Sequence, residues 1–462
     1  MNNQELLNLI DELANEFGVP GVAAGVWHAG RTTYARHGVT SIENPLPIDA
    51  GTLFQAGSIG KTFTATALAL LETEGRVELD APVRRYVPEL HLADATAAAQ
   101  VTLLQLLNHT AGWEGDFFPD TGEGDDALAR FVTQLNEVRQ LTPPGTVFSY
   151  NNAAFCLAGR VIENVTGDTY EGAIRRLILQ PLGFRESFFF RDEVMTRRFV
   201  VGHKPSEGDA LDVARPWALP RNGAPAGGIV TSIADLLTWA RFHSDDDRSA
   251  HGLQQLSSSG LRAMRDPTVH MPGCAFGDAF GIGWFLSDLG GTRLVSHGGS
   301  TNGQEASLAF LPEHDWALAL LTNASPGGMA LNQVAQRRVL AACTGIVEEQ
   351  PQPLSAAPEV LTAYAGEYGA RGMRCMVAVG EAGDLVFTLP NDPELLVLMF
   401  ENGEVPQSTP TVLRAGLVSR QADRFVLAAG PVQGVTGYFD RDGDGRVRAL
   451  HLFGRWLPRV GT

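Results

Sequence analysis

The sequence predicts an α/β (α+β) protein in which an antiparallel sheet is flanked by helices and interrupted by an inserted all-helical lobe, followed by a small C-terminal antiparallel β-barrel. Apolar strand-like segments occur before residue 60 and return after residue 280, with a mostly helical pattern between them. After residue 359 the pattern changes to short β-like runs separated by turn residues. One α/β unit with a helical insertion fits this order better than two sequential units.

The composition is that of an acidic globular protein. The 462 residues exceed one ordinary core, and 44% of them are hydrophobic. The 35 Lys and Arg against 52 Asp and Glu give a net charge of −17, which argues against nucleic acid as a partner. The four cysteines lack the paired spacing of zinc ligands, so we expect no disulfide, metal or cofactor. They are Cys156, Cys274, Cys343 and Cys375.

The chain opens with MNNQELLNLIDELANEFGVPG, which predicts an amphipathic acidic helix. It has no basic start and no long apolar core, so we expect neither a signal peptide nor a membrane span. A cytoplasmic enzyme without a membrane partner is the resulting expectation. Two β-rich segments then flank Ala29-Gly30 and predict a hairpin with its turn there.

The chemistry is expected to centre on Ser58 and Lys61, within the segment FQAGSIGKTFTAT. Helical spacing of apolar and small residues continues to Gly75, which places Ser58 at a helix N-terminus and Lys61 one turn further on. A lysine in that position can take the proton of the serine if its own pKa is lowered. The segment GSIGKT also resembles the end of a phosphate-binding loop, but Gln55 stands where the first glycine should be, which disfavours nucleotide binding.

Three further clusters follow in the chain. LLNHTAG, at Leu106 to Gly112, predicts a helix end and a turn. PPGTVFSYNN predicts a loop in which Tyr150 and Asn152 point the same way before a helix begins at Ala153, although Tyr150 taken alone reads as a buried aromatic residue. In SHGGSTNG, after a strand, the glycines let a substrate approach the backbone, or form a plain turn.

The region after residue 280 predicts the returning sheet and a closing helix. The strands are expected at Gly281 to Leu286, Thr292 to Ser296, Glu305 to Leu311 and Trp316 to Thr322. The helix is expected from about Met329 to Ala342.

Taken together, these motifs resemble a known family. Ser58-Ile59-Gly60-Lys61, Tyr150-Asn151-Asn152 and His297-Gly298-Gly299 look like the three motifs of the class C β-lactamase and D-aminopeptidase branch of the penicillin-binding serine hydrolases. The resemblance covers roughly residues 8 to 345 and includes PLGF and PAGGIVTSIADLLTWA. One departure is that the third motif of true β-lactamases begins with lysine, whereas here it begins with His297, as in esterase and aminopeptidase relatives.

The resemblance implies a β-lactamase-like fold and an acyl-enzyme on Ser58. It implies that Lys61 and Tyr150 share the roles of base and proton shuttle, in an order that the sequence leaves open. Asn152 would hydrogen-bond Lys61 and a substrate amide. The N–H groups of Ser58 and Ser300 would form the oxyanion hole, with Gly298 and Gly299 beside the substrate.

His297 is expected to bear on substrate choice. A lysine there would be a permanent cation able to hold the carboxylate of a penicillin, whereas a histidine is mostly neutral near pH 7. Esters or amino-terminal amides without a nearby carboxylate should therefore be favoured. The alternative is that His297 only packs and hydrogen-bonds Tyr150 or the sheet.

The chain is predicted to divide into a hydrolase domain (1–348), a proline-rich linker (349–358) and a β-barrel domain (359–462). Leu361 to Tyr368 is similar to the start of the lipocalin-like domain often appended to this family. DRDGDG, from Asp440, resembles half a calcium loop, but basic residues follow it and a hairpin turn is favoured. The predicted strands are MRCMVAVG, DLVFTLP, LLVLMF, DRFVLAAG, VTGYFD and RVRALHLFG. We expect the barrel to fold independently and either to abut the active-site mouth or to mediate self-association.

The leading function is a serine hydrolase acting on a small-molecule or short-peptide substrate, namely an amide, an ester or a peptide that can contain a D-amino acid. The alternatives are a β-lactamase proper, an acyltransferase and a catalytically inactive binding protein on this fold. A homo-oligomer is a further expectation.

Overall fold

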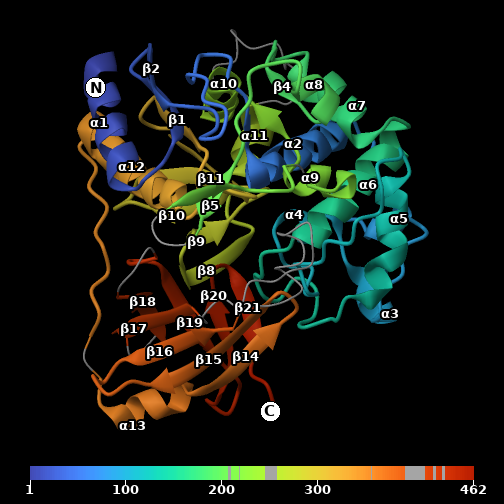
Figure 1. Ribbon diagram of the computed structural model, residues 1–462. Helices are drawn as coiled ribbons and strands as arrows, with labels where there is room; N and C mark the ends of the chain where they lie inside the picture. Colours follow the sequence, from blue (N-terminus) through green and yellow to red (C-terminus); the bar gives the residue numbers. More distant parts are fainter. Residues whose placement is uncertain are drawn as a thin grey trace.

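The computed structural model describes the chain except for residues 207–209, 218, 245–257, 355, 391–410, 420–422, 429–431 and 462. Two eight-stranded antiparallel sheets dominate the described part. One lies among the helices in the upper part of the molecule, and the other curls into a barrel below it (Figure 1). This arrangement confirms the predicted fold class.

The large sheet joins the two ends of the first 345 residues. Its strand order is β2-β1-β13-β12-β11-β10-β9-β8. The bounds are β1 Gly21–His28, β2 Arg31–Gly38, β8 Val269–Cys274, β9 Gly277–Phe280, β10 Phe285–Asp288, β11 Arg293–Thr301, β12 Gln304–Leu311 and β13 Trp316–Thr322. The first hairpin is confirmed, since His28 pairs with Arg31 and both turn residues have positive φ, 49° at Ala29 and 77° at Gly30.

The strand predicted from Gly281 to Leu286 is wrong in its extent. Strand β9 ends at Phe280 and β10 begins at Phe285, and the residues between them form a tight connection in which the Gly281 N–H donates to the Trp284 carbonyl at 2.8 Å. At Gly283 (φ 78°) a Cβ atom would lie 2.6 Å from the Cβ of Ala65. The segment is apolar because this turn packs against helix α2 (Gly60–Thr73), not because it is extended.

Helices cover both faces of the large sheet. Helices α1 (Asn3–Glu16) and α12 (Gly327–Thr344) share one apolar cluster with alternate residues of β1 and β13. Helices α2 and α10 (Ile233–Ser244) pack in a second cluster with the intervening residues. All seven residues of β13 are consequently buried, which explains its continuous apolar sequence.

The inserted region contains the expected helices together with short strands that the sequence did not predict. Its helices are α3 Ala95–Gln100, α4 Leu103–Leu107, α5 Ala127–Gln134, α6 Asn152–Thr166, α7 Tyr170–Ile174, α8 Arg191–Val194 and α9 Ala224–Gly227, and α11 Ser258–Met264 precedes β8. The strands β4 Ser187–Phe188 and β7 Val230–Thr231 form one small sheet with β3 Phe54–Gln55, which precedes the insertion. The strands β5 His203–Pro205 and β6 Leu211–Val213 form a hairpin. Such two- or three-residue strands are too short to produce a recognisable alternation.

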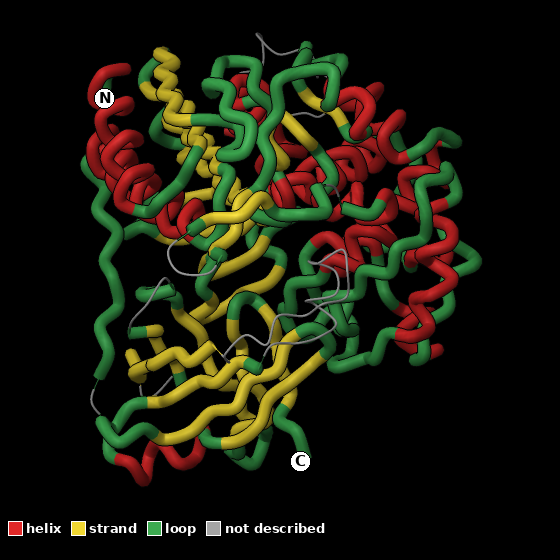
Figure 2. Tube along the Cα trace, in the orientation of Figure 1, coloured by secondary structure: helices red, strands yellow, loops and turns green. Residues whose placement is uncertain are grey.

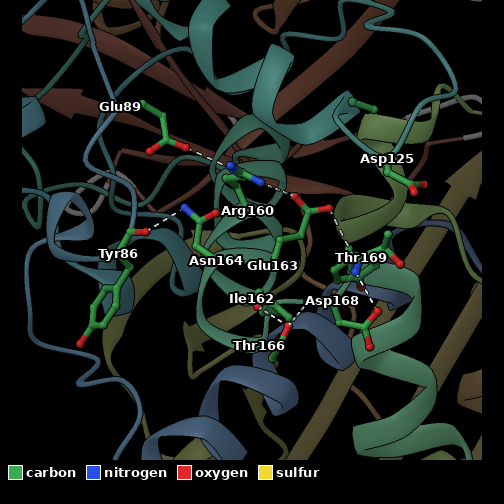
Figure 3. Close-up of polar contacts among 12 residues, drawn as sticks. Tyr86, Glu89, Asp125, Arg160, Ile162, Glu163, Asn164, Thr166, Asp168 and Thr169 are labelled. Atoms are coloured by element: carbon green, nitrogen blue, oxygen red, sulfur yellow. Dashed lines mark hydrogen bonds and ion pairs between the residues drawn. The ribbon is translucent and has the colours of Figure 1, made fainter.

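Helix α6 is fixed at its C-terminal half by a polar network (Figure 3). The guanidinium of Arg160 donates to Glu89 at 3.2 Å and to Glu163 at 2.9 Å. Asn164 Nδ2 donates to the Tyr86 carbonyl at 2.9 Å. These contacts tie the far end of α6 to the segment before it, and Asn152 lies at the start of the same helix.

The second sheet forms a nearly closed barrel, which contrasts with the helix-rich part above it (Figure 2). Helix α13 (Pro358–Leu361) leads into it, and its strands follow in chain order. They are β14 Gly366–Ala370, β15 Met373–Val379, β16 Leu385–Leu389, β17 Thr411–Ser419, β18 Arg424–Leu427, β19 Thr436–Arg441, β20 Val447–Leu452 and β21 Arg455–Pro458. The ends meet where the Val460 N–H donates to the Glu367 carbonyl at 2.8 Å.

Aromatic and aliphatic side chains pack together in the described interior of the barrel. Phe439 contacts the rings of Phe387 and Phe425 at centroid distances of 6.3 and 5.5 Å, and Tyr364 at 4.6 Å. The Asp440 to Gly445 segment is the predicted hairpin turn, with Asp442 Oδ1 accepting the N–H of Asp444 and Arg446. The predicted strand LLVLMF, residues 395–400, lies outside the described residues.

The connection between the two parts runs along one edge of the molecule (Figure 1). Helix α12 ends at Thr344 and α13 begins at Pro358, and the domain boundaries at 348 and 359 remain a prediction. Among the described helices, none is both long and apolar enough to cross a bilayer.

Candidate active site

Ser58 and Lys61 lie where the sequence predicts them. Ser58 is in a turn of 3-10 helix, η1 (Gly57–Ile59), which continues directly into α2, and Lys61 is in the first turn of that helix. Lys61 Nζ lies 3.1 Å from Ser58 Oγ and donates to the carbonyl of Ala226, on α9, at 2.7 Å. The hydrogen bond to the Ala226 carbonyl holds the amine of Lys61 next to the hydroxyl of Ser58.

The environment of Lys61 favours its neutral form. The side chain is fully buried. Burial lowers the pKa of Lys61 to about 7, assisted by the charge of Arg455 and opposed by Cys156 and Asp116. A substantial fraction of the amine is therefore unprotonated near neutral pH and can accept the proton of Ser58.

Tyr150 lies against the same two residues. Its phenol lies beside the side chain of Ser58. Lys61 Nζ is 4.9 Å from the centroid of its ring. Burial raises the pKa of Tyr150 well above its usual range, and the Ser58 contact only partly offsets this. The phenol consequently stays protonated near neutral pH and can donate a proton.

The LLNHTAG segment positions Tyr150 as well as ending a helix. Helix α4 ends at Leu107 as predicted, and His109 follows with φ 61°. His109 Nδ1 accepts the N–H of Asn151 at 2.9 Å, and its ring centroid is 4.3 Å from that of Tyr150. Burial lowers the pKa of His109 well below its ordinary value, so the ring acts as a neutral support.

His297 is buried on β11 and neutral. Because the carbonyl of Gly298 can only accept, the 2.6 Å contact with it places the proton on Nδ1. Burial, and next the charge of Lys61, lower the pKa of His297 to about 3. The ring centroid is 5.1 Å from Phe285 and 6.3 Å from Tyr150, and within the described part of the chain Nε2 has no hydrogen-bond partner.

Two glycines bring η1 against β11 at the expected oxyanion donors. At Gly57 (φ 52°) a Cβ atom would lie 2.8 Å from the backbone nitrogen of Ser300. At Gly299 it would lie 1.9 Å from the Ala56 carbonyl oxygen and 3.0 Å from the nitrogen of Ser58. Only glycines allow this approach, and the backbone nitrogens of Ser58 and Ser300 both lie next to the contact between η1 and β11. Gly298, between His297 and Gly299 in the motif, is exposed.

Asn152 differs from the expectation. Its Nδ2 donates to Asp116 Oδ1 at 2.9 Å, and the expected hydrogen bond with Lys61 is not formed among the described residues. Because Nδ2 is used for Asp116, only Oδ1 of Asn152 could accept from Lys61, whose amine contacts Ser58 and Ala226 instead. Nothing in the sequence around Asp116 marks it as part of a site.

A second carboxyl group that the sequence does not mark is Glu305 on β12. Ser300 Oγ and Ser325 Oγ both donate to its Oε1, at 2.9 and 2.7 Å. Burial raises the pKa of Glu305 to about 7. A lone acidic residue at the start of an apolar strand is the one signal that could have identified it.

Comparisons with known proteins agree with this geometry. Residues 6–342 match the β-lactamase family. Penicillin-binding protein 4 of Amycolatopsis lactamdurans is 33% identical over 377 residues, which cover 78% of this chain and 96% of that protein.

Solved structures extend the similarity over the barrel. SurE matches with a TM-score of 0.76 and 27% identity over 99% of both chains, and it has also been solved with D-Leu. An octameric penicillin-binding protein homologue from Pyrococcus abyssi matches over 99% of both chains with a TM-score of 0.66 and 22% identity, a likeness of fold alone.

Proposed function

The chain belongs to the β-lactamase family of serine hydrolases, and we propose that it forms an acyl-enzyme on Ser58 and hydrolyses a small amide, an ester or a short peptide containing a D-amino acid. The observation that carries the proposal is the 3.1 Å contact between Ser58 Oγ and a buried lysine whose pKa is lowered to about 7. A lysine that only supported the fold would not need to aim its amine at a serine hydroxyl.

In the first step, Lys61 takes the proton of Ser58 as Oγ forms a bond to the substrate carbonyl carbon. The negative charge that develops on the carbonyl oxygen is stabilised by the N–H groups of Ser58 and Ser300, each worth about 3 to 4 kcal/mol. The bond to the leaving group then breaks, and the phenol of Tyr150 lies beside Ser58 to donate the proton that an amine or alkoxide needs.

Lys61 then passes the proton that it took from Ser58 to the Tyr150 phenolate, so both groups return to their starting forms. In the second step, water attacks the acyl-enzyme carbonyl and loses its proton to Lys61. The ester bond to Ser58 breaks, Oγ takes that proton back from Lys61 and the acid product leaves. An amine or alcohol in place of water would give the acyltransferase alternative with the same groups in the same roles.

The neutrality of His297 supports the proposed substrate class. With its pKa lowered to about 3, the imidazole offers no cation for the carboxylate of a penicillin. SurE, which is 27% identical over its length, has been solved with D-Leu, and this favours a D-configured residue beside the scissile carbonyl. A β-lactamase proper is the alternative.

A fluorophosphonate probe tests the serine. Wild type should be labelled and Ser58→Ala should not, because the substitution removes the attacking oxygen. Ser307→Ala is the matched control, since the Ser307 hydroxyl on β12 donates to Gln336 and is not part of the proposed machinery. Failure of wild type to react would leave the inactive binding protein as the better reading.

A substrate panel then separates the hydrolase classes. D- and L-amino acid amides, short esters and nitrocefin should be compared by kcat/KM. We expect D-amino acid amides or esters to exceed nitrocefin. The reverse order would favour a β-lactamase proper.

Self-association is part of the proposal. The homologue from Pyrococcus abyssi is octameric, and it shares the two-part fold over its whole length. Sedimentation velocity should show an assembly larger than the 49.5 kDa chain. A single species of monomer mass at micromolar concentration would contradict it.

A further inference from the structure

The last hairpin of the barrel docks onto the segment that carries Tyr150. Between β20 and β21 it turns at Phe453-Gly454, and the Gly454 carbonyl accepts the N–H of Tyr150 at 2.8 Å. Beside it, the N–H of Trp456 donates to Ser149 Oγ at 3.2 Å. The barrel therefore contacts the catalytic segment through its backbone.

The first residue of β21, Arg455, enters the site from this hairpin. It binds Asp116 with two parallel bonds, from Nε to Oδ2 and from Nη2 to Oδ1, each 3.0 Å long. The side chains are mostly covered, 26% exposed for Arg455 and 9% for Asp116. The guanidinium carbon also lies 5.0 Å from the ring centroid of Tyr150.

Asp116 joins this arginine to Asn152. Its Oδ1 accepts from Arg455 and, at 2.9 Å, from Asn152 Nδ2. A carboxylate can only accept, so the amide nitrogen of Asn152 must face Asp116 and its oxygen must point the other way. A paired and doubly bonded carboxylate holds that amide in one orientation.

We propose that Arg455 and Asp116 are positioning residues, through which the barrel fixes the amide of Asn152 and sets the charge around Lys61. Asn152 then offers Oδ1 to a donor in the site, such as a substrate N–H. The inference rests on the proposed acyl-enzyme chemistry. It adds that this chemistry needs the barrel for full activity, because the barrel supplies Arg455.

The charges around Lys61 predict the direction in which its pKa should shift when one of them is removed. Its surroundings are Cys156 on α6, the rings of Tyr150, His109 and His297, and the Asp116–Arg455 pair. Burial keeps the thiol, the phenol and both imidazoles uncharged, so within this set the pair carries the permanent charges. Arg455 lowers the pKa of Lys61, and Asp116 raises it. Removing the charge of Arg455 should therefore raise that pKa, and removing the charge of Asp116 should lower it.

The test measures the second-order rate of fluorophosphonate labelling of the full-length protein between pH 5 and 9. In Arg455→Gln we expect the rate to fall at least about tenfold and the midpoint of the acid limb to rise by about half a pH unit or more. In Asp116→Asn the midpoint should fall, and in the double variant it should return toward that of wild type. Arg455→Lys keeps the positive charge but cannot form the two parallel bonds to Asp116. It should therefore lower the labelling rate with little change in the midpoint of the acid limb.

Arg414→Gln is the matched control. Arg414 binds Asp384 on the barrel with the same two atoms, Nε to Oδ2 at 2.6 Å and Nη2 to Oδ1 at 3.2 Å, on an exposed surface. Its rate and midpoint should equal those of wild type. The labelled fraction at saturation reports whether each variant is folded.

The outcomes separate the two claims. An unlabelled wild type would overturn the proposed function. A labelled wild type with an unchanged rate or an unmoved midpoint in Arg455→Gln would overturn this inference alone, since a purely structural loss would lower the labelled fraction without shifting the pH dependence.

Discussion

The two eight-stranded sheets contribute to the site in opposite ways. The large sheet is covered by helices on both faces, and its strands β11 and β12 place His297, the Ser300 N–H and Glu305 beside η1. The barrel packs aromatic rings into its described interior and reaches the site with one hairpin. The large sheet therefore supports the site through its backbone, whereas the barrel contacts it through the backbone of one hairpin and the side chain of Arg455.

Loss of Lys61, the proposed base, should have the greatest effect. Lys61→Met removes the proton acceptor, and we expect acylation to slow by up to about 10⁴-fold. In wild type the acylation rate should rise with pH through about 7, as the amine loses its proton. Stopped-flow acylation with an activated ester measures both. A flat profile in wild type would assign the base to another group.

The same variant has a stability signature. Because the folded-state pKa of Lys61 lies below its ordinary value, the unfolded chain binds more protons between about pH 7 and 10.5, and this lysine destabilises the fold less as pH rises through that window. Lys61→Met lacks this buried amine, so its free energy of unfolding in urea should exceed that of wild type. The difference between the two should shrink from pH 7 to 10. An advantage that is constant or grows with pH would contradict the burial of a neutral amine.

The filled interior of the barrel predicts the next largest effect. Phe439→Ala removes a ring that contacts Tyr364, Phe387 and Phe425, and should cost about 3 to 5 kcal/mol in the free energy of unfolding. Val412→Ala is the control, because that side chain is 58% exposed on β17 and should change stability by less than about 0.5 kcal/mol. A cost below about 1 kcal/mol for Phe439→Ala would contradict close packing around this ring.

The backbone contact between η1 and β11 predicts a smaller loss. Gly299→Ala would place a methyl group 1.9 Å from the Ala56 carbonyl oxygen, which must separate the two oxyanion donors. We expect kcat to fall about 10²- to 10³-fold, the cost of one donor. In Gly51→Ala the methyl group would meet its nearest atom at 3.9 Å, and kcat should not change. Equal kcat values for the two variants would remove Ser300 from the oxyanion hole.

The smallest effect concerns substrate choice. His297→Lys introduces a cation where the neutral imidazole stands, and should shift the ratio of kcat/KM for penicillin G over a neutral aryl ester by about tenfold toward penicillin G. The ester alone serves as the internal control for damage to the site. If the ratio did not move, or if wild type already preferred penicillin G, His297 would be a packing residue without influence on the substrate.

How far the sequence predicts the structure depends on how local each feature is. The Ser58–Lys61 pair lies within one helical turn and the Ala29-Gly30 hairpin within two residues, so spacing and turn chemistry were sufficient. The Gly281 to Leu286 segment was misread because burial of a turn and burial of a strand select the same apolar residues.

The polar supports of the site could not be read from the sequence. Arg455 and Asp116 are 339 positions apart, and a contact between two separate units leaves no periodicity in either. The contact of Asn152 with Asp116 could not be predicted for the same reason, since Asp116 lies in a loop without a motif.

The hairpin contact also has a consequence for the order in which the enzyme becomes active during synthesis. The large sheet and its helices are complete once α12 ends at Thr344, and Arg455 follows 111 positions later (455 − 344), so at roughly 5 to 20 residues per second the ribosome would add the arginine about 6 to 22 seconds after that helix. During that interval the nucleophile, Lys61 and Tyr150 can already be folded together, but Asp116 has no cation and the amide of Asn152 has no fixed support. The nascent chain would thus carry an unfinished active site, and full activity would switch on only when the barrel closes on the completed molecule.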